Sequence, residues 1–251
     1  MKDIAKADMV TTEIADGILT ITLYRPEDNN RIDRRAQAAI VAAVNLANED
    51  DSIRVIVVTG KGDYFCGGGR PDGHPNGTLK QRSAYALAFV EMKEAMERCR
   101  VPIVAKVSGH AVAGGMSLMS FCDLAVAADD VEFGYPEINY GQFPALALAM
   151  VIPMMPPKEA FDILLSGDRF GAERARDLRI INKAVPRAEL DAAVKAYTDM
   201  LKSKNQVSMG LGRRAYYAMA PMTPASRLEY AQTFLMTLLA AEGTGQVPVN
   251  H

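Results

Sequence analysis

Three short segments of this chain hold residue types and spacings that could do chemistry. The first covers residues 63–70 and reads Asp-Tyr-Phe-Cys-Gly-Gly-Gly-Arg. Consecutive glycines allow unusual backbone dihedral angles and let a ligand approach the N–H groups closely. The segment has neither the GxxxxGK[ST] nor the GxGxxG pattern, so it indicates an amide-lined loop or a flexible turn and not specifically a phosphate site.

The second segment covers residues 108–118, where a strand-like run passes through Gly114 and Gly115 into a helix-like run. A helix that begins near Gly114 presents N–H groups without intrahelical partners and the positive end of its dipole. Such a terminus can stabilise a developing oxyanion. Glycines at this place also suit close packing of a helix on a strand, so both interpretations stay open.

The third segment is residues 133–141, in which Glu137 is the only acid and precedes a run without charges. A carboxyl group in apolar surroundings has a raised pKa and can carry protons near neutral pH. The alternative is a surface glutamate at a turn. Proton transfer by Glu137 is therefore a hypothesis that depends on what surrounds this residue.

Hydrophobic periodicity predicts alternating strands and helices around these segments. Two alternating runs flank Asp16-Gly17, which suits a tight turn and predicts a hairpin over residues 10–24. Asp33 suits the N-cap of a helix extending to about Asn48. Apolar runs and helical spacing predict strands at 54–59, 103–107 and 124–127 and a long helix at 79–99.

After Pro156 the pattern becomes mainly helical. The expected helices are 158–165, 172–178, 188–202, 207–218 and 225–241, with one strand at 181–185. This order of elements predicts an α/β core over residues 1–190 and a helical region over residues 191–251.

Composition excludes several classes of protein. The chain has 251 residues, of which 49% are hydrophobic and 23% charged, so it has the apolar content of a folded protein. Its 28 basic and 30 acidic side chains leave a net charge of −2, which gives no general attraction for nucleic acid or anionic lipid. We therefore expect neither nucleic acid nor a membrane as a partner.

The cysteines indicate neither a metal site nor a disulfide framework. Cys66, Cys99 and Cys122 are widely spaced, and they are odd in number with no CxxC pair. A reducing compartment fits this usage, and the first residues do not resemble a secretory signal, so we expect a cytoplasmic protein. The uncharged run 138–157 contains four prolines, which predicts a buried wall of the core and not a membrane span.

Together these segments resemble the crotonase superfamily, also called the enoyl-CoA hydratase/isomerase family. The resemblance extends from Gly17 to about Gly243. The motifs that carry it are Leu23-Tyr24-Arg25-Pro26-Glu27 with Asn30, residues 65–69, 108–123 and 133–141, Phe143-Pro144, and residues 164–167 through Ala172, Ala175 and Asn182 to Val185-Pro186.

This resemblance implies a crotonase-like spiral of ββα units followed by a C-terminal helical trimerisation region. It implies an acyl-CoA thioester as substrate, coenzyme A being part of that substrate and no separate cofactor or metal being needed. A homotrimer or a dimer of trimers is the expected assembly. Two backbone amides would hold the thioester oxygen, and motif matching assigns them to Gly67 and Gly114. Substrate and CoA contacts are expected from Arg25, Cys66, Gly68, Gly69, Arg70 and Tyr140.

The catalytic pattern departs from that of the family's hydratases, which typically use two glutamates. Glu137 matches one of them, whereas Ser117 stands at the position of the other. A hydroxyl at its ordinary pKa is a poor proton carrier, so Glu137 would act as the single acid/base group, with Ser117 beside it. Arg31 and Arg70 also depart from the usual Ala and Asp and add positive charge near the CoA groove.

Three functions follow from the resemblance. The first is an enoyl-CoA hydratase or isomerase that works through an enolate held by the two amides. The second is a hydroxycinnamoyl-CoA hydratase-lyase acting on an aromatic acyl-CoA, which Ser117 and Glu137 also fit. The third is a homologue that binds acyl-CoA without catalysis. Turnover of different enoyl-CoA esters would discriminate among them.

Overall fold

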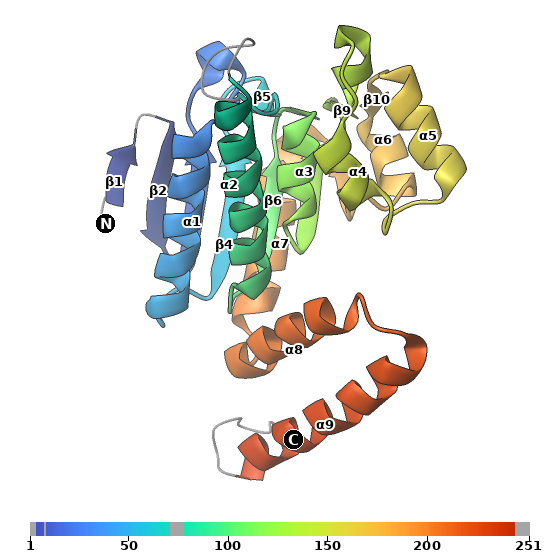
Figure 1. The fold of residues 1–251 in the computed structure, drawn as a ribbon. Helices are drawn as coiled ribbons and strands as arrows, with labels where there is room; N and C mark the ends of the chain where they lie inside the picture. Colours follow the sequence, from blue (N-terminus) through green and yellow to red (C-terminus); the bar gives the residue numbers. More distant parts are fainter. Residues whose placement is uncertain (1–3, 8, 71–77, 244–251) are drawn as a thin grey trace.

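The computed structural model describes residues 4–7, 9–70 and 78–243 and shows an α/β protein with a helical C-terminal region (Figure 1). A seven-stranded sheet forms its centre, with neighbouring strands in the order β1-β2-β3-β4-β6-β8-β11. From β3 onward every neighbouring pair is parallel. The bounds are β1 Ile4–Ala7, β2 Val10–Ala15, β3 Ile18–Leu23, β4 Val55–Gly60, β6 Ile103–Val107, β8 Leu124–Ala128 and β11 Lys183–Val185.

The predicted hairpin is confirmed, and the sheet extends beyond it. Strands β2 and β3 pair antiparallel, and the turn between them places Asp16 at φ 50° and Gly17 at φ 72°. Both positive angles belong to the tight hairpin turn that an Asp-Gly pair favours. Strand β1 pairs antiparallel with β2 and was not predicted.

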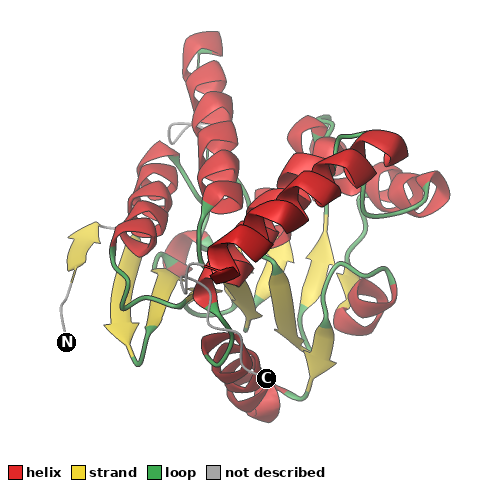
Figure 2. Ribbon diagram, turned by 90° about the horizontal axis from the view of Figure 1, so that it is seen from below, coloured by secondary structure: helices red, strands yellow, loops and turns green. Residues whose placement is uncertain are grey.

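Helices cover both faces of this sheet (Figures 1 and 2). Helices α1 (Arg34–Glu49) and α2 (Leu79–Arg98) pack together on one face, and α7 (Leu190–Lys202) packs on β4, β6 and β8 from the other. The predicted cap of α1 is confirmed, because Asp33 Oδ1 accepts the amide hydrogens of Arg35 and Ala36 at 2.9 and 3.0 Å. A covered parallel sheet explains why its strands read as continuous apolar runs.

A second sheet of four strands lies beside the first and carries the glycine-rich segments. Its strand order is β10-β9-β7-β5, with bounds β5 Tyr64–Cys66, β7 His110–Val112, β9 Glu132–Gly134 and β10 Phe170–Gly171. Helix α3 (Gly114–Ser120) begins two residues after β7, which confirms the predicted helix start. The short helix η3 (Pro136–Tyr140) follows β9. This small sheet therefore brings the three candidate segments together.

The prediction that residues 138–157 form a buried wall is wrong. Helix α4 (Ala145–Val151) buries only Ala147 and Val151, which lie one helical turn apart. Tyr140 and Ile152 are 78% and 66% exposed, and Phe143 and Leu146 are also exposed. A run without charges thus covers the surface here instead of filling the core. Helices α5 (Pro157–Ser166) and α6 (Ala172–Asp177) pack next to it (Figure 1).

Helices α8 (Gln206–Met219) and α9 (Pro224–Gly243) project away from the sheet (Figure 1). Arg213 on α8 anchors them, because its Nε donates to Asp123 Oδ2 at 2.8 Å and its guanidinium also donates to the carbonyls of Met96 and Cys99. Tyr217 donates to the other oxygen of Asp123 at 3.4 Å. One buried arginine thus ties the helical region to the end of α2.

The described residues offer neither a membrane-spanning helix nor a cluster of metal ligands. Across residues 4–7, 9–70 and 78–243, the helices are too short or too polar to cross a membrane. The same residues contain no group of three His, Cys, Asp or Glu side chains that could hold a metal ion.

Candidate active site

The loop after β5 corrects one assignment made from the sequence. The N–H of Gly67, expected to hold a thioester oxygen, donates to the carbonyl of Asn29 at 2.7 Å. That hydrogen bond uses the only donor of the peptide, so Gly67 has no free amide to offer a substrate. A methyl carbon at Gly67 would also lie 2.9 Å from the Asn29 side chain. Gly67 is thus a structural glycine that joins this loop to the end of the short helix η1 (Pro26–Asp28).

Gly69 has the free amide that Gly67 lacks. The bridge between Ile32 and Gly69 uses the flanking groups, since Ile32 N donates to Gly68 O at 2.9 Å and Arg70 N donates to Ile32 O at 2.8 Å. The amide of Gly69 itself makes no hydrogen bond with any residue the structure describes. A methyl carbon at Gly69 would lie 2.2 Å from the hydroxyl oxygen of Tyr85, so a side chain at this position requires Tyr85 to move.

A strained residue sets the start of α3. Ala113 has φ 53° and ψ −127°, a backbone conformation that residues other than glycine rarely adopt. Its N–H donates to Gly134 O at 2.8 Å. Gly114 begins α3 directly after this turn, and its amide makes no hydrogen bond with any residue that the structure describes. A methyl carbon at Gly114 would lie 3.1 Å from Gly69 N, which places the two residues on the same small space.

Glu137 is held in the first turn of η3 with one carboxylate oxygen buried. Its Oε2 makes no hydrogen bond to any described residue. Burial raises the pKa of this carboxyl, because removal of water disfavours the charged form. A buried carboxyl without a fixed partner, attached to a rigid turn, has the properties of a proton carrier. The surface-glutamate alternative does not fit these surroundings.

Tyr135 is a site residue that the sequence reasoning missed. Its side chain is 2% exposed and lies near Ser117, which is 1% exposed on α3. Burial and the nearby carboxyl of Glu137 raise the pKa of Tyr135, which stays neutral. A tyrosine two positions before Glu137 was the available signal.

The other expected contacts differ in accessibility. Cys66 is fully buried, its sulfur accepts the Gly68 N–H at 3.4 Å, and burial raises its pKa to about 12. Its side chain therefore does not face solvent. Gly68 has φ 109°, a backbone conformation that favours glycine, and a methyl carbon there would lie 3.4 Å from Gly114 N. Tyr140, at the end of η3, has its ring in solvent.

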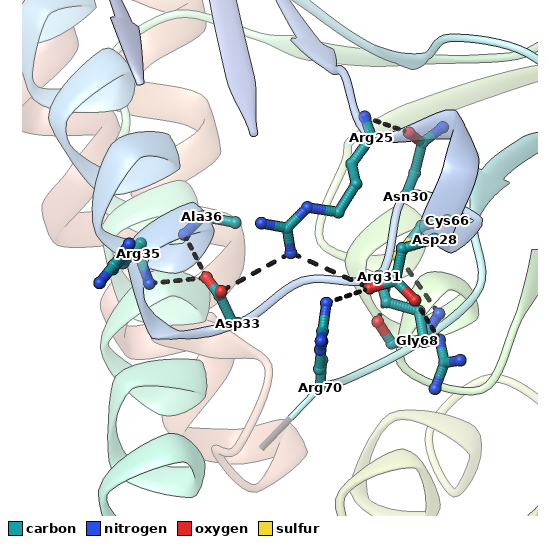
Figure 3. Close-up of polar contacts among 10 residues, drawn as sticks. All are labelled: Arg25, Asp28, Asn30, Arg31, Asp33, Arg35, Ala36, Cys66, Gly68 and Arg70. Atoms are coloured by element: carbon teal, nitrogen blue, oxygen red, sulfur yellow. Dashed lines mark hydrogen bonds and ion pairs between the residues drawn. The ribbon is translucent and has the colours of Figure 1, made fainter. Parts of the chain in front are cut away.

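An arginine cluster lies beside the glycine loop (Figure 3). One carboxylate, that of Asp28, pairs with Arg70 at 2.7 Å, Arg31 at 3.3 Å and Arg25 at 3.9 Å. Arg25 also lies 3.8 Å from Asp33, and its Nη1 is buried without a hydrogen bond to the described residues. Three arginines share two aspartates, so the cluster carries an excess of positive charge next to Gly68 and Gly69.

This fold and this arrangement of glycine amides and acid define a class of protein. The profile of the enoyl-CoA hydratase/isomerase family matches residues 13–239. The chain belongs to this family, the crotonase superfamily. The match contains every strand of the seven-stranded sheet from β3 to β11.

Individual relatives support the same placement. The chain is 29% identical over 219 residues to the mitochondrial enoyl-CoA hydratase domain-containing protein 3 of Mus musculus, covering 85% of this chain and 71% of the relative. An enoyl-CoA hydratase structure from Mycobacterium smegmatis superimposes with a TM-score of 0.88 at 26% identity, covering 92% of this chain and 91% of that one. The human domain-containing protein 3 superimposes with a TM-score of 0.88 at 22% identity, which shows the shared fold alone. The crotonase fold expected from the sequence is thus confirmed.

Proposed function

We propose that the protein is an enoyl-CoA hydratase or isomerase in which the amides of Gly69 and Gly114 hold the thioester oxygen of an acyl-CoA. The observation that carries this proposal is the pair of free N–H groups on facing glycines. Charge that moves onto the thioester oxygen as an enolate forms would be stabilised by both donors. In comparable sites the loss of one donor costs about 3 kcal/mol of barrier.

Glu137 is the acid/base group in this proposal. Burial raises the pKa of its carboxyl, which therefore holds a proton more tightly than an exposed glutamate does. Its proton affinity is thus closer to that of the reacting carbon or water. One carboxylate suffices when the proton that it removes is the proton that it returns. Ser117 beside it contributes a neutral hydroxyl in place of a second carboxylate.

Coenzyme A would extend from the two amides toward the arginine cluster. Arg25 and Arg70 are the proposed phosphate contacts, together with Arg31, which shares Asp28 with them (Figure 3). In this proposal Gly68 lets the thioester pass close to the backbone, Cys66 contributes only packing beneath the loop, and Tyr140 contacts substrate from its exposed position.

A homotrimer or a dimer of trimers is the proposed assembly. It is supported by exposed apolar side chains on the projecting helices, where Leu228 is 75% and Met236 62% exposed. Such residues on an extended arm favour burial against another copy of the chain. The cytoplasmic location expected from the sequence also stays a proposal, since the curated relatives carry the word mitochondrial in their names.

Hydratase-lyase activity on an aromatic acyl-CoA is the second candidate. It is supported by the hydroxyl of Tyr85, which lies against Gly69 and could hold a phenol. Incubation with crotonyl-CoA, a 3-enoyl-CoA and feruloyl-CoA tests the proposal. Turnover of either of the first two supports the hydratase or isomerase, and release of an aromatic aldehyde from the third supports the lyase. CoA-ester binding without any turnover would indicate the non-catalytic homologue.

A further inference from the structure

Residue 69 is a glycine because of its neighbour and not because of its backbone. The φ of Gly69 lies outside the positive range that favours glycine, so the backbone itself would accept alanine there. The three heavy atoms nearest to a methyl carbon at Gly69 all belong to Tyr85: the hydroxyl oxygen at 2.2 Å, Cζ at 2.8 Å and Cε1 at 3.3 Å. One phenol ring therefore excludes a side chain from residue 69.

Tyr85 meets Gly69 end-on, because its hydroxyl oxygen is the nearest atom and the ring carbons follow behind it. A Cα–C bond is about 1.5 Å long, so this oxygen lies within about 3.7 Å of the Cα atom of Gly69. Tyr85 is 8% exposed in the second turn of α2. A rigid ring that is buried to this extent has little room to move aside, so it is a firm support for the loop.

The amide of Gly69 needs support from outside its own peptide group. Glycine has the least restricted backbone, and this amide makes no hydrogen bond within the described residues. The peptide groups on either side are held by Ile32, which donates to Gly68 O at 2.9 Å and accepts from Arg70 N at 2.8 Å. Tyr85 contacts the α-carbon between those two peptides. Ile32 and Tyr85 thus fix residue 69 together and leave its N–H unused.

We propose that Tyr85 is a positioning residue that holds the amide of Gly69 in place opposite Gly114. This inference rests on the proposed function, in which both amides bind the thioester oxygen. A donor in such a site acts through its fixed place, and a shift of about 1 Å can lower the rate about a hundredfold. Loss of this support should therefore lower kcat by a similar factor for every enoyl-CoA ester and leave KM nearly unchanged.

The contact predicts that one substitution repairs another. Gly69→Ala should lower kcat about a hundredfold, because its methyl group pushes the loop away from Tyr85. Tyr85→Leu should lower kcat about tenfold, because residue 69 loses its support. The double variant should recover at least about tenfold over Gly69→Ala, since the methyl group then fits where the end of the phenol ring was. Steady-state kinetics with crotonyl-CoA and with a 3-enoyl-CoA measure these effects.

Two controls distinguish positioning from a general role in packing. Gly67→Ala places a methyl carbon 2.9 Å from the Asn29 side chain, so Tyr85→Leu should not repair it. Phe89→Leu shortens another buried side chain of α2, one turn further along the helix. It should lower Tm without changing kcat and without repairing Gly69→Ala. Circular dichroism checks that each variant is folded.

Tyr85→Phe removes only the atom nearest to Gly69 and is the milder test if Tyr85→Leu does not fold. It should repair Gly69→Ala in part, by about threefold. Failure of both substitutions at Tyr85 to repair Gly69→Ala, or equal repair by Phe89→Leu, would overturn the inference and leave the proposed function intact. A wild type that turns over no enoyl-CoA would overturn the proposed function and the positioning role together. The Tm values of the same variants would then still show whether the two residues share one space.

Discussion

The backbone nitrogen of Gly69 faces Gly114 so closely that a methyl carbon on Gly114 would lie 3.1 Å from it. Two glycines from different loops thus border one small space, and the amide of each makes no hydrogen bond within the described residues. Tyr85 lies where a side chain at Gly69 would extend, and the strained turn at Ala113 directly precedes Gly114. In the proposed function, the thioester oxygen binds in the space between the two glycines.

A side chain at Gly114 should therefore abolish thioester chemistry. Gly114→Val places two further methyl groups against Gly69 N, so turnover of every enoyl-CoA should fall by at least about a hundredfold, the scale of a lost oxyanion donor. CoA binding, measured by calorimetry, should persist because the nucleotide binds elsewhere. Gly171→Ala is the control, since a methyl carbon there has nothing within 4 Å. Retained turnover in folded Gly114→Val would remove the central claim.

Loss of the acid at residue 137 should affect rate and not binding. Glu137→Gln keeps the shape of the side chain but cannot accept a proton, so kcat should fall about a hundredfold or more. KM for the acyl-CoA should change little. Glu159→Gln serves as a control because this glutamate is exposed on α5. Steady-state kinetics with crotonyl-CoA give the comparison, and near-normal turnover by Glu137→Gln contradicts the assignment.

The same substitution should stabilise the protein in a pH-dependent way. A carboxyl whose pKa is raised by folding binds more protons in the native state than in the unfolded state. The free energy of unfolding then falls as pH rises through the raised pKa, because ionisation of the buried group is unfavourable. Glu137→Gln should therefore match wild type in acid and exceed it in Tm at neutral pH. Thermal denaturation at several pH values measures this, and a constant Tm difference would contradict it.

The arginine cluster should act on coenzyme A and not on the acyl group. Arg70→Ala should raise KM for an acyl-CoA about fivefold, a scale expected for one partly exposed charge contact, and leave kcat unchanged. The same variant should treat the corresponding acyl-pantetheine thioester, which lacks the nucleotide phosphates, as wild type does. Arg98→Ala is the control, since that side chain is 69% exposed on α2. Equal effects on both thioesters would show that Arg70 acts by other means.

The anchor of the helical region should dominate its stability. Arg213 is 9% exposed, so Arg213→Met removes the ion pair with Asp123 and the guanidinium donors to the carbonyls of Met96 and Cys99, while the Ile103 amide and the Tyr217 hydroxyl still donate to Asp123. Breaking a buried pair of this kind costs about 3 kcal/mol. Arg98→Met, which removes only an exposed pair with Glu94, should cost less than about 1 kcal/mol. Urea denaturation compares the two variants, and equal losses would show that the anchor contributes little.

Local patterns made much of this fold predictable. Capping by Asp33, the Asp16-Gly17 turn and the helix that starts at Gly114 each depend on a few neighbouring residues, and all three are confirmed. The second sheet was harder to predict, because its strands are only two or three residues long and show no periodicity. The exposed surface at residues 138–157 was missed because a lack of charge does not by itself bury a segment.

The site was predictable in its segments but not in its atoms. Glu137 and Gly114 were singled out from their surroundings in the sequence, and their roles stay predictions. The choice between Gly67 and Gly69 depends on which of their amides donates to the Asn29 carbonyl, and that contact joins two loops far apart in the chain. Tyr135 was missed for a similar reason, since Ser117 and Glu137 beside it lie on other elements.

The way α8 and α9 attach to the core has a consequence for synthesis of the chain. All strands of both sheets precede α7 in the chain, as does each residue of the proposed site. A nascent chain can therefore assemble the proposed site before the last two helices leave the ribosome. Until α8 is synthesised, the carbonyls of Met96 and Cys99 lack the hydrogen bonds that Arg213 donates to them. Docking of α8 on the end of α2 is thus a late step, which follows synthesis of every residue of the proposed site.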